Sequence, residues 1–270
     1  MAPATVVLIT GAGRGIGQAL TEAYLLRPNH TVIATVRDCT DPKYDALKKS
    51  PVGSGSRLLL VSIESTSNTD PEKAVEQVKA AGVDHIDVVI ANAGVAPPSE
   101  PFDTLDVNDL THAFQVNTVS TVVLYQAVKP LLEKSAAPKW MSISSAAGSI
   151  TRLEIHQAHG VAAYGSSKAA QNFFTQSQVS GPQILPAVTN RRLTPRALHS
   201  KEKNLIAFAI HPGLVQTEMG NAGARAMGME QAPDTIGDSV MKSMNMIDAA
   251  TRENTSGKFY NVIDSSEIPW

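Results

Sequence analysis

Short apolar runs alternate along the chain with longer segments in which apolar residues recur at helical spacing. The apolar runs are nearly continuous, as in strands that are covered on both faces of a parallel sheet. We predict strands over Thr5–Thr10, Thr31–Val36, Arg57–Val61, Ile86–Ala91, Lys139–Ser144, Leu205–Ile210 and Lys258–Val262. We predict helices over Gly15–Leu26, Pro42–Ser50, Asp70–Ala81, Asp106–Lys134, Tyr164–Gln178 and Asp234–Thr251. The alternation predicts an α/β fold: a single domain over residues 1–270 with one doubly wound parallel sheet and helices on both faces.

Composition and charge narrow the class of protein. Hydrophobic residues make up 43% of the 270 positions and charged residues 18%, as in a globular domain with a sizeable core. The net charge of −2 gives no basic excess that would attract nucleic acid or an anionic membrane. Cys39 is the single cysteine and no secretion signal is recognised, so we expect a reducing, cytoplasmic location. No apolar run is long enough to span a membrane.

A glycine-rich turn connects the first predicted strand to the first predicted helix, in the segment Thr10-Gly11-Ala12-Gly13-Arg14-Gly15-Ile16-Gly17. Glycines let a backbone turn tightly and approach a pyrophosphate, which binds at the positive N-terminus of the helix. The alternative is an ordinary glycine-rich loop between a strand and a helix. The candidate cofactor contacts are Gly11, Gly13, Arg14, Gly15, Ile16 and Gly17.

The glycine spacing T-G-x-x-x-G-x-G resembles that of the short-chain dehydrogenase/reductase family. Further motifs of this family follow in order over nearly the whole chain: Ala91-Asn92-Ala93-Gly94, Ser144-Ser145-Ala146-Ala147-Gly148, Tyr164-Gly165-Ser166-Ser167-Lys168 and His211-Pro212-Gly213. The resemblance implies a Rossmann-type fold, a nicotinamide cofactor and oxidoreductase activity. It also implies cofactor contacts at Ser62, Ile63, Asn92, Ala93, Gly94, Tyr164, Lys168, Pro212, Gly213, Val215 and Thr217. At Ser62-Ile63 the sequence departs from the family, which usually has an aspartate near the adenine.

Two arginines favour NADPH/NADP+ over NADH. An acid at the end of the second strand would bind the ribose hydroxyls of NAD, whereas a basic residue favours the 2′-phosphate of NADP. By resemblance, Val36 takes the place of that acid and Arg37 takes the next place, which binds phosphate. Arg14 in the glycine turn is a second basic residue at this end. Two guanidinium groups near one phosphate are typical of an NADP site.

Tyr164 and Lys168 are the central catalytic candidates, because their i, i+4 spacing places both on one helix face. A nearby ammonium lowers the pKa of a phenol from about 10, so that it can protonate a carbonyl oxygen as hydride arrives. The resemblance adds Ser145, with Ser144 as the alternative, and Asn117, which in relatives holds a water that links the lysine to solvent. His211 is interpreted as a structural residue. No cluster has metal-ligand spacing, so no metal site is predicted.

The motifs together predict NADPH-dependent reduction of a small-molecule ketone to an alcohol. A narrower resemblance, carried by LLRPNHTVIATVRD and GKFYNVIDSSEIPW, is to fungal carbonyl reductases related to norsolorinic acid ketoreductase. It implies an aromatic or polyketide-type substrate and a place in secondary metabolism. The predicted substrate wall comprises Val95–Phe102, Gly148–Ala163 and Leu214–Gln231, of which the last suits a methionine-rich lid. Alcohol oxidation at the same site and a non-catalytic NADP-binding scaffold are the alternatives.

The segment 179–195 is longer than the corresponding connection in the family. It contains Pro182, Pro186 and Pro195, and an interior proline costs a helix about 3 kcal/mol. We therefore predict that the helix from Tyr164 breaks near Val179 and that an irregular insertion follows. The segment is either a native loop or a retained intron, and the sequence leaves both alternatives open. In relatives this helix packs against a second subunit, so a homodimer or homotetramer is implied, and the insertion leaves that assembly open.

Overall fold

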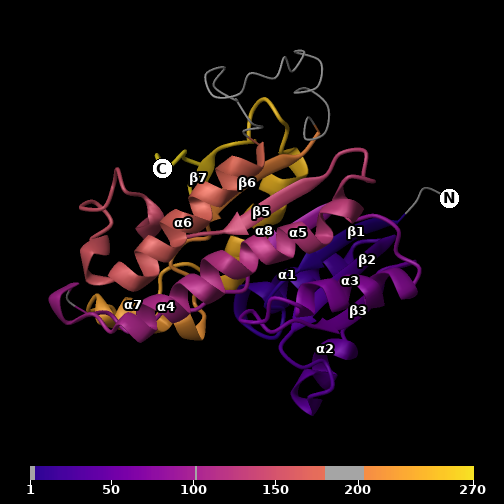
Figure 1. Cartoon of the computed structure of the whole chain (residues 1–270), viewed down its shortest axis with the longest axis horizontal. Coiled ribbons are helices and arrows are strands. Elements are labelled where there is room, and N and C mark those ends of the chain that lie inside the picture. The colour runs from indigo at the N-terminus through magenta and orange to yellow at the C-terminus, as the bar shows by residue number, and fades with distance from the viewer. Residues whose placement is uncertain (1–3, 101, 180–203) are drawn as a thin grey trace, which may run out of the picture.

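A computed structural model describes residues 4–100, 102–179 and 204–270 of the chain. Seven parallel strands form one sheet in the order β3-β2-β1-β4-β5-β6-β7 (Figure 1). They are β1 (Thr5–Ile9), β2 (His30–Val36), β3 (Arg57–Ser62), β4 (Val88–Ala91), β5 (Lys139–Ile143), β6 (Ile206–His211) and β7 (Phe259–Asn261). The predicted Rossmann-type sheet is confirmed, and the strand ends lie within one or two residues of their predicted positions. The predicted insertion at 179–195 lies outside the described residues from Ser180 onward.

The helices follow the predicted order, with additions. They are α1 (Gly15–Leu26), α2 (Asp45–Lys48), α3 (Asp70–Ala80), α4 (Val107–Phe114), α5 (Ser120–Leu132), α6 (Ala162–Val179), α7 (Glu218–Ala226) and α8 (Ile236–Ala249). Short 3₁₀ turns are η1 (Pro42–Tyr44), η2 (Phe102–Thr104), η4 (Ala146–Gly148) and η5 (Ala158–Gly160). The helix predicted over Asp106–Lys134 is divided by a π-helical turn, η3 (Gln115–Val119). No helix within the described ranges is both long and apolar enough to cross a membrane.

Side chains of the central strands alternate between two apolar layers. Val6 and Leu8 of β1 pack in the layer covered by α3 and α5, whereas Val7 and Ile9 pack in the layer covered by α1 and α8. All four are buried, so β1 has no polar face, as its continuous apolar sequence predicts. Figure 1 is viewed from the side of the sheet on which α4, α5 and α6 lie.

The strand order reverses direction between β1 and β4. From β1 the chain proceeds outward to β2 and β3, returns to β4 on the other side of β1, and then continues outward to β7. The loops after β1 and β4 therefore diverge to opposite sides and leave a crevice at the carboxyl ends of these strands. In open α/β sheets, ligands bind in such a crevice.

Candidate active site

A cavity of about 760 Å³ occupies this crevice. Residues from the carboxyl ends of the strands, the glycine-rich turn and α6 line it. Fourteen of the predicted site residues are among the lining residues: Gly11, Gly13, Arg14, Gly15, Ile16, Arg37, Ile63, Asn92, Ala93, Gly94, Tyr164, Lys168, Pro212 and Thr217. The other six predicted site residues do not line the cavity: Gly17, Ser62, Asn117, Ser145, Gly213 and Val215.

The glycine-rich turn depends on small residues at specific contacts. Gly11 and Gly15 have φ of +66° and +57°, in the left-handed region that favours glycine. A Cβ on Gly13 would lie 2.5 Å from the Tyr44 ring, and one on Gly17 would collide with the Gly11 carbonyl oxygen. Gly17 thus packs α1 against the turn and does not line the cavity. The first turn of α1 borders the cavity at Gly15 and Ile16, and its N-terminus has no side-chain cap, which suits an anion.

The two arginines predicted for the phosphate occupy different environments. Arg37 follows β2 with its side chain exposed, and its guanidinium has no hydrogen bond or ion pair to any residue in the described ranges. Arg14 instead forms an ion pair with Glu218, at the start of α7. Sequence analysis also missed Lys43, which lines the same end of the cavity and pairs with Asp41 at 2.5 Å. Its only signal was a basic residue soon after Arg37.

The end of β3 presents Ile63 to the cavity but not Ser62. The Ser62 hydroxyl accepts a hydrogen bond from the Cys39 N–H at 2.9 Å. That contact ties the end of β3 to the loop after β2. In this structure Ser62 therefore holds the loop after β2 in place and does not border the cavity.

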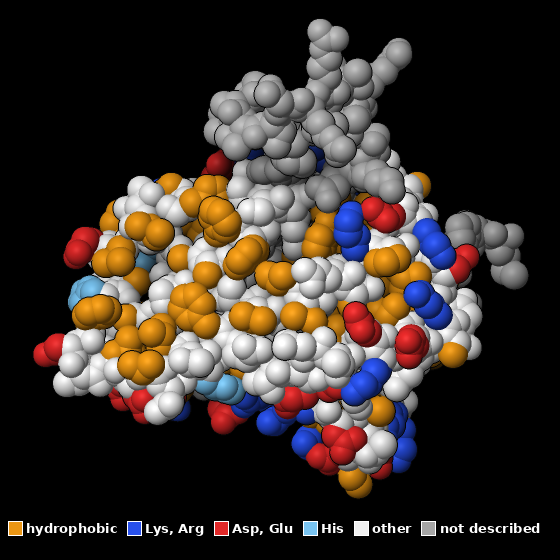
Figure 2. Space-filling view, viewed as in Figure 1, with side chains coloured by type: hydrophobic (Ala, Val, Ile, Leu, Met, Phe, Trp, Pro, Cys, Tyr) orange, Lys and Arg blue, Asp and Glu red, His pale blue; other side chains and the backbone are white. Residues whose placement is uncertain are grey.

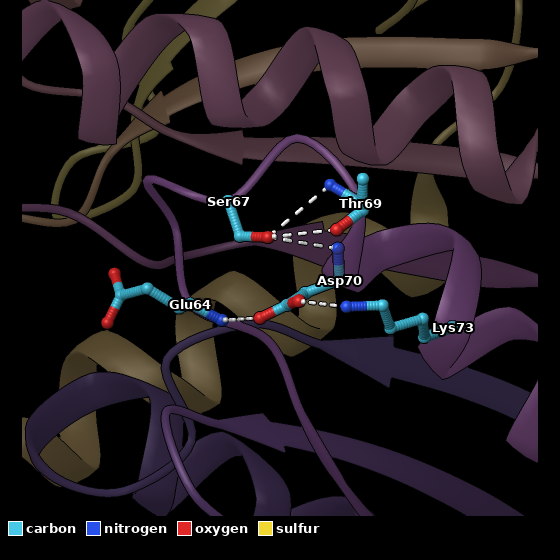
Figure 3. A network of polar contacts seen from close by, with 5 residues as sticks. All are labelled: Glu64, Ser67, Thr69, Asp70 and Lys73. Carbon is cyan, nitrogen blue, oxygen red and sulfur yellow. Dashed lines mark hydrogen bonds and ion pairs between the residues drawn. The ribbon is translucent and has the colours of Figure 1, made fainter.

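A polar network fixes the loop between β3 and α3, where Glu64 and Ser67 border the cavity (Figure 3). The Ser67 hydroxyl accepts from the N–H groups of Thr69 and Asp70 at 3.3 and 3.2 Å. The Asp70 carboxylate accepts from the Glu64 N–H at 3.2 Å and pairs with Lys73 at 3.3 Å. These contacts lower the pKa of Asp70, chiefly through the Glu64 N–H and the Ser67 hydroxyl. The loop is thereby held against the start of α3.

Tyr164 and Lys168 both line the cavity and lie on one face of α6. The Lys168 ammonium lies 5.9 Å from the centre of the Tyr164 ring and donates to the Ile143 carbonyl oxygen at 2.8 Å. Lys168 is 3% exposed, and this burial lowers its pKa to about 7. Burial raises the pKa of Tyr164, and a hydrogen bond with Ser145 opposes that rise. The net shift of the Tyr164 pKa is therefore upward in the chain without cofactor, opposite in direction to the lowering that the sequence predicts.

Of the two neighbouring serines, Ser145 is the one whose side chain contacts Tyr164 and lowers its pKa. Ser145 lies at the N-cap of η4, where its hydroxyl also accepts from the Ala147 N–H at 3.2 Å. Ser144 lines the cavity, but its buried hydroxyl has no hydrogen-bond partner among the residues that the structure describes. The two neighbouring serines are thus distinguished by their contacts.

Asn117 lies in the π-helical turn and is fully buried. Its amide oxygen accepts from the Val95 N–H at 2.8 Å, and its amide nitrogen donates to the Val95 carbonyl and the Ser167 hydroxyl, both at 2.9 Å. These bonds join the loop after β4 to α6. A Cβ on Gly94 would lie 3.1 Å from the Asn117 amide oxygen and 3.5 Å from the Lys168 ammonium nitrogen. The side chain of Asn117 therefore fixes the surroundings of Lys168.

The segment after β6 supplies Pro212 and Thr217 to the cavity, and Thr217 caps α7 through the Gly220 N–H at 3.0 Å. Gly213 has φ of +93° and lies close to Asp234, which accepts from the Leu214 N–H at 2.8 Å. Val215 is buried, and Met219 lines the cavity.

His211 lies at the end of β6 outside the cavity lining. Burial is the largest cause that lowers its pKa, to about 4, which leaves the ring neutral. Within the described ranges, no three His, Cys, Asp or Glu side chains form a group that could hold a metal.

The chain is similar to known proteins over most of its length. The family model described as short chain dehydrogenase matches residues 5–180. The short-chain dehydrogenase srdF of Neurospora crassa is 43% identical over 98% of both chains. The norsolorinic acid ketoreductase of Aspergillus parasiticus is 39% identical over 98% of this chain and 91% of that protein. The crystal structure of NADPH-bound carbonyl reductase from chicken fatty liver is 26% identical, with a TM-score of 0.79 over 99% of this chain and 100% of that chain. The chain therefore belongs to the short-chain dehydrogenase family.

Proposed function

We propose that the protein is an NADPH-dependent ketoreductase. The observation that carries the proposal is that Tyr164 and Lys168 lie together in the cavity lining, with the Ser145 side chain in contact with Tyr164. A nicotinamide dinucleotide spans such a crevice, with its pyrophosphate at the N-terminus of α1. The chicken carbonyl reductase, whose structure contains NADPH, shares the fold over its whole length.

The residues fit this cofactor at several points. The uncapped N-terminus of α1 would hold the pyrophosphate, and the exposed Arg37 would hold the 2′-phosphate together with Arg14. Asn92, Ala93, Gly94 and Ile63 border the crevice, while Pro212 and Thr217 stand at its far wall. The bound cofactor supplies hydride to the carbonyl carbon of the substrate.

Each catalytic side chain has a separate task. The Tyr164 phenol donates its proton to the substrate oxygen as negative charge develops there. The Ser145 hydroxyl, which contacts Tyr164, donates a hydrogen bond to the same oxygen. The Lys168 ammonium stabilises the resulting tyrosinate and holds the ribose. Asn117 holds the loop after β4 against α6 through its bonds to Val95 and Ser167. It also belongs to the relay that returns a proton to Tyr164.

The proposed substrate is an aromatic or polyketide-type ketone of secondary metabolism. Two features support this class. The Aspergillus parasiticus relative is a norsolorinic acid ketoreductase, and it aligns over almost the whole chain. The substrate end of the cavity carries Val95 and Met219, and the exposed Met227 and Met229 follow on the predicted lid. Flexible thioethers accommodate large apolar ligands.

The direct test is to mix the purified protein with NADPH and a panel of aromatic ketones, and to follow the absorbance of the reduced nicotinamide. We expect the absorbance to fall only when both a ketone and Tyr164 are present. With NADH in place of NADPH, we expect slower turnover. Tight NADPH binding without turnover of any ketone would favour the alternative of a non-catalytic NADP-binding scaffold. Turnover of alcohols with NADP+, but of no ketone with NADPH, would favour alcohol oxidation as the reaction of this site.

We further propose that the protein forms a homodimer through the face made by α4, α5 and α6. Apolar side chains gather on this face (Figure 2), among them Phe173, Phe174 and Val119, whose exposed fractions are 68%, 39% and 37%. Exposed aromatic residues so close together are unusual on a monomer. Light scattering should give twice the chain mass for the wild type and a monomer for Phe173→Glu. A monomeric wild type would contradict this assembly.

A further inference from the structure

Lys168 has a buried neighbour, Gln171, for which the proposed reaction provides no role. Gln171 follows Lys168 by three positions on α6, so the two side chains share a helix face. Its side chain is fully buried, and its amide oxygen accepts from the Lys168 ammonium at 3.0 Å. Among the described residues, this oxygen and the Ile143 carbonyl oxygen at 2.8 Å are the two acceptors that hold the ammonium.

The amide nitrogen of Gln171 continues the contact toward α5. It donates to the Thr121 hydroxyl at 3.4 Å, and that hydroxyl donates to the Asn117 backbone carbonyl at 3.0 Å. Every bond in this series is donated away from Lys168. The series therefore links the ammonium to the π-helical turn entirely through side chains that are 0 to 4% exposed.

A buried ammonium is costly unless acceptors replace its water. Burial lowers the pKa of Lys168, and no carboxylate of the described residues forms an ion pair with it to offset that burial. Tyr164 is the titratable neighbour on α6 itself. The helices, strands and turns around this stretch of α6 carry seven other titratable side chains, and none contributes to the shift: Asp109, His112, Tyr125, Lys129, Lys139, His159 and His211. Within the described part of the chain, the ammonium is therefore held by two neutral oxygen atoms, those of the Ile143 carbonyl and the Gln171 amide.

We propose that Gln171 is a positioning residue, whose amide oxygen keeps Lys168 protonated and directed at Tyr164 while its amide nitrogen is anchored through Thr121 to Asn117. The proposal rests on the proposed function for its catalytic meaning, but the contact itself is a property of the chain without cofactor. An apolar side chain of equal length would fill the space and leave the ammonium with one acceptor fewer. A carboxylate there would supply a negative charge at the same distance.

Two substitutions of nearly equal size test this proposal with opposite expected signs. Gln171→Met removes the acceptor, and Gln171→Glu replaces it with a charged one. We would measure the pKa of Lys168 by NMR of the full chain without cofactor, with ¹³C-labelled lysine, and assign the signal by its loss in Lys168→Met. A hydrogen bond to a charged group is equivalent to about 1–2 pKa units, so the pKa should fall by that amount in Gln171→Met and rise in Gln171→Glu.

Gln178→Met is the matched control. Gln178 is a buried glutamine on the same helix, but its amide oxygen has no hydrogen-bond partner among the described residues. Ten residues of α-helix separate it from Lys168 by about 15 Å. We expect the pKa of Lys168 to stay unchanged in this variant. Thr121→Val, which releases the Gln171 amide nitrogen, should lower that pKa in the same direction as Gln171→Met but by less.

The activity measurement then gives the catalytic consequence. The alkaline limb of kcat/KM for ketone reduction should move to lower pH in Gln171→Met and to higher pH in Gln171→Glu. If the wild type reduces no ketone, the proposed function fails, and the NMR titration still decides the role of Gln171. An unchanged Lys168 pKa in folded Gln171→Met would overturn the positioning role. If that variant does not fold, an unchanged pKa in Thr121→Val would overturn it.

Discussion

Arg14 in the glycine-rich turn and Glu218 at the start of α7 form an ion pair across the mouth of the cavity. Both side chains are largely exposed, at 70% and 79%, so the pair contributes about 0–1 kcal/mol at most. It ties α7, which begins beside the Thr217 cap, to the turn that faces the pyrophosphate position. The same arginine is our second candidate for the 2′-phosphate. A bound phosphate and Glu218 would therefore compete for one guanidinium.

This competition predicts that Glu218→Gln strengthens NADPH binding. Removal of the carboxylate releases Arg14, so the dissociation constant for NADPH should fall by up to about fivefold, in line with a weak surface pair. The dissociation constant for NADH, which lacks the phosphate, should not change. Titration of intrinsic fluorescence at low salt would measure both. Equal effects on the two cofactors would show that Arg14 does not bind the phosphate.

Arg37 should determine the preference for NADPH more strongly, because its guanidinium has no partner among the described residues. A charge-assisted bond to phosphate contributes about 1.5–3 kcal/mol, so Arg37→Ala should reduce the ratio of NADPH to NADH affinity roughly 10–100-fold. Arg225→Ala is the matched control, since Arg225 is exposed and lies outside the cavity lining. A ratio that is the same in Arg37→Ala and wild type would refute this assignment.

Burial of Lys168 predicts a specific dependence of stability on pH. Its pKa is lowered from 10.5 to about 7 in the folded chain, so the unfolded chain binds more protons between these values. The free energy of unfolding should therefore rise with pH across this window, by up to about 5 kcal/mol for this one group.

Lys168→Met removes this dependence. The variant should gain most in melting temperature below pH 7, where the buried ammonium costs the wild type most, and the gain should shrink toward pH 10. Lys242→Met, in which the replaced lysine is not in the cavity lining, should show no comparable change of slope. A constant difference between Lys168→Met and wild type at every pH would contradict a lowered Lys168 pKa.

The sheet could be predicted from sequence because its inner strands, from β2 to β6 in the sheet order, are buried on both faces, which gives each a short continuous apolar run. The π-helical turn Gln115–Val119 could not, because the apolar pattern continues through it and one extra residue per turn leaves no signal. Helix α7 was missed for a different reason. Its sequence includes Gly220 and Gly223, which disfavour a helix. Packing explains the exception, since a Cβ on Gly220 would collide with the Val215 carbonyl oxygen.

The candidate site was predictable where its residues share one local motif. Tyr164 and Lys168 share a helix face, and Ser145 follows directly from the end of β5. Three further residues could not be assigned from sequence. Glu218 pairs with Arg14, which is distant in the chain. The contacts of Gln171 and Lys43 with nearby residues depend on the rotamers that these side chains adopt. The irregular insertion at 179–195 and its origin stay predictions. Comparing melting temperature, mass and turnover with and without this segment would measure its effect.

The central claim is that Tyr164 protonates the substrate oxygen, and Tyr164→Phe tests it most directly. The substitution removes one hydroxyl and leaves the ring beside Lys168 in place. Loss of a general acid costs about 10²–10⁴ in rate, so kcat for ketone reduction should fall by that factor while the dissociation constant for NADPH stays unchanged. A Tyr164→Phe variant that binds NADPH normally and retains most of its kcat would contradict the account.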